Sequence, residues 1–233
     1  SVWRPGQFVM VRPKKEWADL VWGRPFSICK MTEKELTLFF QEAGRGTKRM
    51  GQLRPGDEVT LWGPLGRGFA VESEKPTLLL AGGIGIAPFV GYVERHPAPQ
   101  NMRLEVGHRM PLECYPFREL AGMIQATAHH ETCRADLTAF IECMEQRIRE
   151  TRDGLILACG PTPFLRTVQT LSLQYGARAQ LSLESRMACG VGACLGCVVN
   201  SAERMKNVPT PGWPVQVCQC GPVFWADEID LNE

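Results

Sequence analysis

The chain has 233 residues, 44% of them hydrophobic, and a formal net charge of +1 at pH 7. This length allows one large or two ordinary domains, and the near-neutral charge gives no electrostatic reason to expect binding to nucleic acid or to an anionic membrane. No apolar run approaches the roughly 18 residues that a membrane-spanning helix needs. We therefore expect neither a nucleic-acid partner nor a membrane partner.

Short strand-like stretches separated by turn signals occupy the first part of the chain, residues 1–74. Pro-Gly or Gly-Pro pairs at Pro5, Pro55 and Gly63 mark turns between these stretches. Close spacing of this kind predicts a small antiparallel β-barrel. Its strands are expected at residues 7–11, 26–30, 35–40 and 58–62.

The pattern changes over residues 75–182, where strand-like and helical stretches alternate. The apolar run at residues 77–81 is typical of a strand that is buried on both faces of a parallel sheet. The alternation predicts a doubly wound α/β domain of the nucleotide-binding kind. Further strands are expected at residues 103–107, 122–126, 154–158 and 177–181, with helices at 135–151 and 163–175.

Half of the ten cysteines lie in the last part of the chain, residues 183–233. Cys189, Cys194 and Cys197 have the C-x4-C-x2-C spacing of a plant-type [2Fe–2S] cluster, and Cys218 and Cys220 follow. The glycines between the first three let the loop curl and direct backbone N–H groups at the sulfur atoms. A four-cysteine zinc site is the alternative. Such sites usually combine two CxxC knuckles, whereas this loop has one CxxC unit joined to a third cysteine through a glycine-rich stretch.

The remaining cysteines are scattered singly along the chain. Such a distribution fits a reducing compartment that contains a metal protein better than it fits a secreted disulfide framework. It therefore predicts a cytoplasmic protein.

Two glycine-containing loops follow predicted parallel strands. Gly83 and Gly85 come directly after the first of these strands, where glycines let a phosphate-bearing ligand approach the backbone. Such loops also serve helix–strand packing, so this signal alone is weak. Cys159 and Gly160 end the fourth strand, at the same carboxyl edge of the predicted sheet.

Short motifs follow one another along nearly the whole chain: RPFS at residues 24–27, GRGT at 44–47, GPLG at 63–66, GGIG at 82–85 and CGP at 159–161. A cysteine-rich tail covers residues 184–199 and 217–224. The order of the motifs resembles that of the ferredoxin-NADP reductase superfamily. The tail is more specific and resembles the electron-transfer subunits of NAD-dependent dihydroorotate dehydrogenases.

The resemblance implies three bound groups, with a set of contacts for each. The FAD contacts are Arg24, Pro25, Phe26 and Ser27 at the flavin, and Gly46 and Thr47 at the pyrophosphate. The NAD(H) contacts are Gly83, Gly85, Cys159 and Gly160, with Cys159 near the nicotinamide ring. The [2Fe–2S] ligands are Cys189, Cys194, Cys197 and Cys218.

The fourth cluster ligand requires a choice between two cysteines. The family pattern is Cys-x-Asp-Gly-Pro, which aligns Cys218 with the ligand and Cys220 with the acidic position. We predict Cys218 as the ligand. Cys220 is then a spare thiol that either substitutes for Cys218 or lies just outside the ligand shell.

The chain departs from the family pattern at two further places. Residues 126–131 replace an acidic, glycine-containing stretch, which leaves the preference between NAD and NADP open. His129, His130 and Glu131 in this stretch suggest a metal site, but polar residues at a strand end are the favoured interpretation. Relatives also have at least one strand before the position of Trp3, so the first strand of the barrel is expected to be missing.

These cofactors together indicate an electron-transfer function. A nicotinamide transfers two electrons as hydride, a [2Fe–2S] cluster takes one at a time, and a flavin converts between the two. By resemblance, electrons pass from the FMN of a catalytic dihydroorotate dehydrogenase subunit through the cluster to FAD and NAD+, in pyrimidine biosynthesis. This chain is then an oxidoreductase subunit of a hetero-oligomer, with no catalytic acid or base of its own for dihydroorotate.

Two alternatives remain open on the sequence. One is a reductase subunit of the same architecture that serves a hydrogenase, a sulfite reductase or a ferredoxin. The other is a non-catalytic redox sensor or zinc-stabilised binding module that has kept the fold.

Apolar residues around the cysteines indicate either packing or a partner surface. Exposed apolar groups near the cluster would form an interface for the catalytic subunit. The residues concerned are Met187, Val191, Leu195, Trp213, Val223, Phe224 and Trp225.

Overall fold

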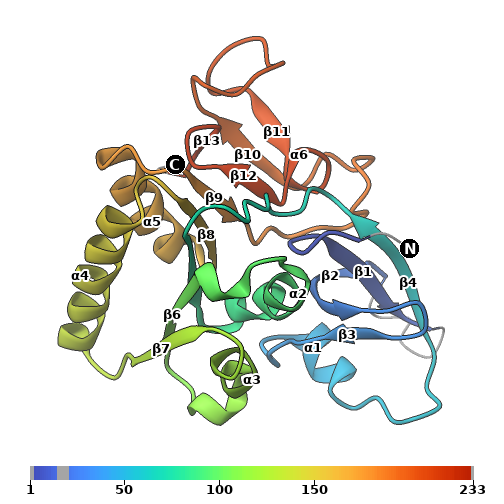
Figure 1. The fold of residues 1–233 in the computed structure, drawn as a ribbon. Helices are drawn as coiled ribbons and strands as arrows, with labels where there is room; N and C mark the ends of the chain where they lie inside the picture. The colour runs from blue at the N-terminus through green and yellow to red at the C-terminus, as the bar shows by residue number, and fades with distance from the viewer. Residues whose placement is uncertain (1–2, 15–20, 232–233) are drawn as a thin grey trace.

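The computed structural model shown in Figure 1 describes residues 3–14 and 21–231, and these residues fold around three β-sheets. The N-terminal sheet is antiparallel, with the strand order β3-β2-β1-β4. Its elements are β1 (Phe8–Pro13), β2 (Arg24–Met31), β3 (Leu36–Leu38), the short helix α1 (Arg45–Met50) and β4 (Val59–Leu65).

The second sheet has six strands in the order β12-β9-β8-β5-β6-β7. Strands β5 to β9 run parallel, and the register places Leu80 of β5 beside Glu105 of β6 and Ala158 of β8. The strands are β5 (Thr77–Gly82), β6 (Met102–His108), β7 (Gln125–His130), β8 (Leu155–Cys159) and β9 (Ala179–Ser182). The helices are α2 (Ala87–Arg95), α3 (Phe117–Ala121), α4 (Arg134–Glu150) and α5 (Thr162–Gln174), with 3₁₀ turns at Gly83–Ile86, Pro99–Asn101 and Leu112–Cys114.

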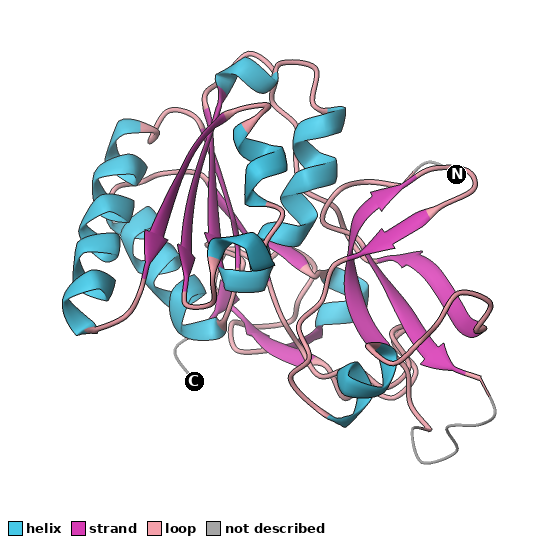
Figure 2. Ribbon diagram, turned by 90° about the horizontal axis from the view of Figure 1, so that it is seen from below, coloured by secondary structure: helices cyan, strands magenta, loops and turns pink. Residues whose placement is uncertain are grey.

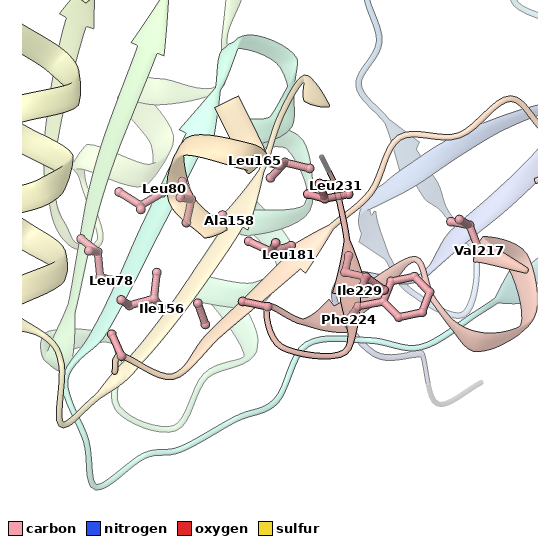
Figure 3. Close-up of a cluster of buried hydrophobic side chains, with 14 of the residues drawn as sticks. Leu78, Leu80, Ile156, Ala158, Leu165, Leu181, Val217, Phe224, Ile229 and Leu231 are labelled. Atoms are coloured by element: carbon pink, nitrogen blue, oxygen red, sulfur yellow. The ribbon is translucent and has the colours of Figure 1, made fainter. Parts of the chain in front are cut away.

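Helices cover both faces of this sheet, as Figure 2 shows. Side chains alternate between the faces along each strand. Leu78 and Leu80 of β5 belong to a core with α4 and α5, part of which is drawn in Figure 3, whereas Leu79 and Ala81 pack with α2 and α3. Full burial of such a side chain contributes about 1.5–3 kcal/mol. The apolar run of β5 is thus explained by burial on both sides, and the doubly wound fold is confirmed.

One predicted strand is displaced. The sequence predicts a strand at residues 122–126, but β7 begins at Gln125. The backbone N–H groups of Gly122, Met123 and Ile124 bond to carbonyls of α3, so these residues complete the end of that helix. The prediction placed the strand too early because a five-residue helix leaves little periodic signal.

The C-terminal segment forms a small sheet and also joins the large one. Its own sheet has the order β11-β10-β13, built from β10 (Val198–Ser201), β11 (Pro214–Gln216) and β13 (Ile229–Asp230). A short helix, α6 (Val217–Cys220), precedes β12 (Val223–Trp225), which pairs antiparallel with β9. The division at residues 74 and 182 remains a prediction, since β12 belongs to the sheet of the middle segment.

None of the helices among the described residues has both the length and the apolar character that a bilayer crossing requires.

Candidate functional site

The cysteine-rich loop and α6 bring four cysteines together as two pairs. The Sγ atoms of Cys189 and Cys194 lie 3.4 Å apart. The backbone N–H of Cys218 donates to Sγ of Cys197 at 3.4 Å, and both of these cysteines are buried. The structure thus places the four predicted ligands in two contacting pairs.

The paired arrangement fits two irons better than one zinc. Around a single zinc ion each Zn–S distance is about 2.3 Å, so all four sulfur atoms lie within about 4 Å of one another. Among the described residues, no three of these cysteines have sulfur atoms that all lie within 4.8 Å of one another. A [2Fe–2S] cluster instead takes two protein ligands on each iron. The donor set therefore suits the cluster.

The two pairs differ in how they stabilise a thiolate. Hydrogen bonding from the backbone N–H of Val191, followed by bonds from Cys194 and Ala193, lowers the pKa of Cys189 to about 6. Burial, followed by the neighbouring Cys197, raises the pKa of Cys218 to about 12. A coordinating metal deprotonates a thiol outright, so a cluster would hold Cys218 as thiolate. The loop N–H groups provide part of the same stabilisation at Cys189.

Contacts with the N-terminal sheet fix the position of the cysteine loop. Nε1 of Trp62 in β4 donates to the carbonyl of Cys189 at 3.0 Å. Gly190 has a φ of +71°, and a Cβ there would lie 2.5 Å from Cγ of Met10 in β1. Only glycine allows this approach without strain or displacement. The predicted cluster loop therefore rests directly on the sheet that is predicted to hold FAD.

Cys220 has different surroundings from Cys218. The two are separated by two residues on α6, which is about 200° around a helix. Cys218 is 3% exposed and contacts Cys197, whereas Cys220 is half-buried and packs against the apolar core. This geometry supports Cys218 as the ligand, although the assignment remains a prediction.

A cleft of about 820 Å³ extends between the N-terminal sheet and the carboxyl edge of the parallel sheet. It receives side chains from all three parts of the chain. The predicted site residues that line it are Pro25, Phe26, Ser27, Thr47, Gly83, Gly85 and Cys159. The C-terminal segment contributes Glu184, Ser185, Met187 and Pro222.

Arg24 and Gly46 lie beside the cleft and contact each other. The guanidinium of Arg24 donates to the carbonyls of Trp22 at 2.8 Å and Gly23 at 3.2 Å. Gly46 is buried, and a Cβ there would lie 2.9 Å from Nε of Arg24. The hydroxyl of Thr47 accepts N–H bonds at the start of α1. The motifs RPFS and GRGT, remote in sequence, are therefore neighbours.

The two glycine loops of the parallel sheet touch at its carboxyl edge. A Cβ on Gly85 would lie 2.1 Å from the carbonyl oxygen of Cys159, and one on Gly160 would lie 3.0 Å from Cα of Gly82. Gly83 has a φ of +55°, in the left-handed region that glycine favours. The two loops can approach this closely only because the residues at the contact are glycines, which have no side chain. Gly160 does not line the cleft itself, among the residues that the structure describes.

Cys159 lines the cleft with a buried thiol. Burial, reinforced by the nearby Glu184, raises the pKa of Cys159 to about 12, so its thiol stays protonated near neutral pH. Desolvation of the Glu184 carboxyl in the cleft raises its pKa as well. Glu184 was not predicted as a site residue. Its position at the start of the cysteine motif, soon after the last parallel strand, is the signal that could have indicated it.

Several aromatic and polar residues of the cleft were also missed. Phe40 packs against Phe26 with the two rings tilted and their centroids 5.4 Å apart, and Tyr115 and Glu131 form part of the wall on the parallel-sheet side. The loops that carry them show no recognisable motif, so only the fold places them.

His129 and His130 both lie in β7, but their side chains have different partners: His129 bonds to Glu105, and His130 stacks on His108. They therefore do not form a metal site with Glu131.

Comparison with known proteins identifies the family. The family described as "Iron-sulfur cluster binding domain of dihydroorotate dehydrogenase B" matches residues 184–230. The chain is 34% identical to the dihydroorotate dehydrogenase B (NAD(+)) electron transfer subunit of Caldanaerobacter subterraneus subsp. tengcongensis, over 97% of this chain and 86% of the relative. It is 33% identical to the protein of the same name from Listeria monocytogenes serotype 4a, over 97% and 87%.

Solved structures show the same fold at lower identity. An NADH-dependent reduced ferredoxin-NADP oxidoreductase superposes with a TM-score of 0.77 at 23% identity, over 99% of this chain and 80% of the other. The ferredoxin-NADP+ reductase of Plasmodium falciparum gives 0.56 at 14% identity, over 73% and 77%. With the cysteine pairs and the shared cleft, these matches establish that the chain belongs to the family of dihydroorotate dehydrogenase B electron transfer subunits.

Proposed function

We propose that this chain transfers electrons between NAD(H) and the catalytic subunit of a dihydroorotate dehydrogenase, by means of bound FAD and a [2Fe–2S] cluster. It acts as one subunit of a hetero-oligomer in pyrimidine biosynthesis. The family membership supports this function along nearly the full length of the chain. The structural observation that carries it is one cleft that residues of the N-terminal sheet, the parallel sheet and the cysteine segment all line.

The residues present fit the three groups that the family implies. FAD exchanges electrons with a nicotinamide in pairs and with an iron–sulfur cluster singly, which is the chemistry that the bound groups supply. We assign the flavin to RPFS at residues 24–27 and its pyrophosphate to Gly46 and Thr47. The nicotinamide dinucleotide is assigned to Gly83, Gly85, Cys159 and Gly160. Cys189, Cys194, Cys197 and Cys218 hold the cluster.

The protein's own contribution is to position these groups and to shield them. Glycine backbone at residues 83, 85 and 160 allows close approach at the sheet edge, and the protonated Cys159 offers a neutral contact. The loop N–H groups around Cys189 stabilise negative charge on its sulfur. The bound FAD and cluster would supply the path for electrons between the catalytic subunit and NAD(H). The catalytic subunit also supplies the acid–base chemistry of dihydroorotate oxidation.

We also propose a cytoplasmic location. All ten cysteines are free thiols in the structure, and at least four of them are proposed as metal ligands. Thiols in this number persist in reducing compartments and are oxidised to disulfides elsewhere.

The test is to compare the purified chain alone with its complex with the catalytic subunit. The isolated chain should contain iron, acid-labile sulfide and FAD, and should oxidise NADH with an artificial electron acceptor. Dihydroorotate should be oxidised, with reduction of NAD+, only by the complex. Dihydroorotate turnover by this chain alone would contradict the proposal, as would a colourless chain that contains zinc in place of iron.

A further inference from the structure

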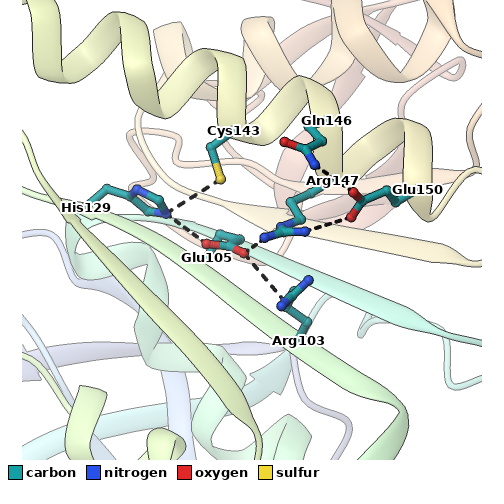
Figure 4. Close-up of polar contacts among 7 residues, drawn as sticks. All are labelled: Arg103, Glu105, His129, Cys143, Gln146, Arg147 and Glu150. Carbon is teal, nitrogen blue, oxygen red and sulfur yellow. Dashed lines mark hydrogen bonds and ion pairs between the residues drawn. The ribbon is translucent and has the colours of Figure 1, made fainter.

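We propose that Glu105, His129 and Cys143 form a second metal site, which binds zinc or a similar divalent transition metal. The site is separate from the cysteine loop and does not depend on the function proposed above. Oxygen, nitrogen and sulfur ligand atoms of these three residues all lie within 4.8 Å of one another. Figure 4 shows the three side chains meeting between the sheet and α4.

Three separate elements supply the ligands. Glu105 lies on β6, His129 lies on the neighbouring strand β7, and Cys143 projects from α4, which packs over both strands. The register places His129 beside Gly107, two residues beyond Glu105, so both side chains are on the same face of the sheet. The fold therefore brings together three types of donor atom from distant parts of the chain.

The spacing of the donor atoms suits a zinc ion. Nε2 of His129 lies 2.8 Å from Oε2 of Glu105, and Sγ of Cys143 lies 3.9 Å from the same nitrogen. With Zn–N and Zn–O distances of about 2.0–2.1 Å and Zn–S of about 2.3 Å, these separations correspond to angles of about 85–90° and 125–130° at the metal. The two angles bracket the tetrahedral value, so small side-chain adjustments complete the geometry.

Neighbouring groups already orient two of the ligands. Glu105 is fully buried, and its other oxygen accepts a bond from Nε of Arg147 at 3.0 Å, with Nε of Arg103 at 3.7 Å. The ring of His129 stacks on Phe140 with centroids 4.7 Å apart. Hydrogen-bonded carboxylates and fixed imidazoles are typical of metal sites, where such outer contacts raise affinity.

The local charge allows a divalent ion. The guanidinium groups of Arg147 and Arg103 are matched by the carboxylates of Glu105 and Glu150, so these four groups together carry no net charge before any metal binds. Binding releases the thiol proton of Cys143, so the site gains only one positive charge. A thiolate, an imidazole and a carboxylate together select zinc over magnesium or calcium, which prefer oxygen alone.

The site is accessible and adjoins the cleft. The side chain of His129 is 22% exposed and Cys143 is half-buried, which leaves a route for the ion and a position for water as a fourth ligand. Phe140 and Met144 of α4 line the cleft. A bound metal would tie α4 to β6 and β7 and thereby fix this wall.

Zinc binding to the cluster-loaded chain tests the proposal. The protein is dialysed against buffered low-micromolar zinc, and zinc and iron per chain are measured together, so that zinc replacing cluster iron is recognised. We expect one zinc per chain beyond the full iron content. Cys143→Ala and His129→Ala should each weaken zinc binding by at least about tenfold.

Matched variants and a second measurement complete the design. Cys114→Ala and His130→Ala remove the same residue types elsewhere and should bind zinc as the original chain does, and thermal melting identifies any variant that fails to fold. Substitution with ¹¹³Cd should give one resonance with a shift typical of a single thiolate, which Cys143→Ala abolishes. Absence of zinc from the original chain, or unchanged affinity in both ligand variants, would overturn the proposal.

Discussion

Cys218 and Cys220 stand two residues apart on α6, and the structure separates their surroundings. Because Cys218 contacts Cys197 and Cys220 packs against the core, Cys218→Ser should lower iron content and shift or abolish the EPR signal of the reduced cluster. Cys220→Ser should leave that signal nearly unchanged. The opposite pattern would show that Cys220 is the ligand and that the alignment with the family is wrong by two residues.

Arg24 provides the only guanidinium of the RPFS motif, and it lies over the buried Gly46. Charge-assisted hydrogen bonds from arginine are about twice as strong as neutral ones, so Arg24→Ala should lower the FAD content of the purified protein. The flavin-to-protein ratio from absorbance measures this. Arg12→Ala on the exposed side of β1 is the control and should retain its FAD. Equal FAD content in both variants would remove Arg24 from the site.

At the scale of elements, Arg147 joins α4 to β6 through the buried carboxylate of Glu105. Arg147→Ala removes a charged hydrogen bond of 3.0 Å, so we expect a loss of about 1.5–3 kcal/mol in the free energy of unfolding at pH 7. Urea unfolding in the presence of a chelator measures this loss. Arg152→Ala, whose partner Asp153 is exposed, should cost much less.

The same contact gives a pH dependence with a definite sign. Burial alone would raise the pKa of Glu105, but hydrogen bonds from His129 and Arg147 outweigh it and hold the pKa below its usual 4.5. A carboxyl with a lowered pKa contributes stability above its unfolded pKa and loses it as the pH falls through the folded pKa. The difference between the original chain and Arg147→Ala should therefore shrink below pH 4.5. A difference that grows in acid would contradict this account.

Local patterns in the sequence predicted most elements but not all of their limits. The buried run of β5 and the amphipathic helices α4 and α5 were predicted closely, because long periodic segments carry a strong signal. The start of β7 was predicted too early, since the end of α3 takes up the backbone bonds of the preceding residues. Strand β12 was not predicted at all, because its pairing with β9 joins residues about forty positions apart.

The residues of the candidate site also differ in how far the sequence could predict them. The spacing of Cys189, Cys194 and Cys197 is local, so these three could be predicted as cluster ligands from the sequence, whereas Cys218 and the FAD contacts came from resemblance. The glycine loop at Gly83 and Gly85 gave a weak signal of its own for a nucleotide. Glu184 and the Glu105–His129–Cys143 site escaped prediction, because each depends on segments that only the fold brings together. Spacing along the chain carries no information about such contacts.

At the scale of the whole molecule, packing accounts for only some of the apolar residues around the cysteines. Met187, Val223 and Phe224 are buried, but Val191 and Leu195 of the cysteine loop are 47% and 68% exposed. Exposed apolar side chains beside a redox centre indicate a protein interface. Leu195→Asp should therefore weaken assembly with the catalytic subunit and leave the iron content intact, as measured by gel filtration and elemental analysis.

Leu173→Asp is the matched control for this substitution. Leu173 lies on α5 and is 52% exposed, so it tests a similar charge on a different surface. We expect it to assemble normally. Full assembly by Leu195→Asp would place the partner elsewhere.

Strand β12 has a consequence for how the molecule moves. It follows α6 closely and is hydrogen-bonded into the large sheet, while Arg67, just beyond β4, donates its N–H to the carbonyl of Gly221 at 2.6 Å. The cysteine segment is therefore held to the large sheet through β12 and to the end of the N-terminal sheet through Arg67, so it is not a mobile arm on a flexible linker. Electron delivery within the subunit needs no diffusive search by a mobile arm, so solvent viscosity should affect only the encounter with partner and nucleotide.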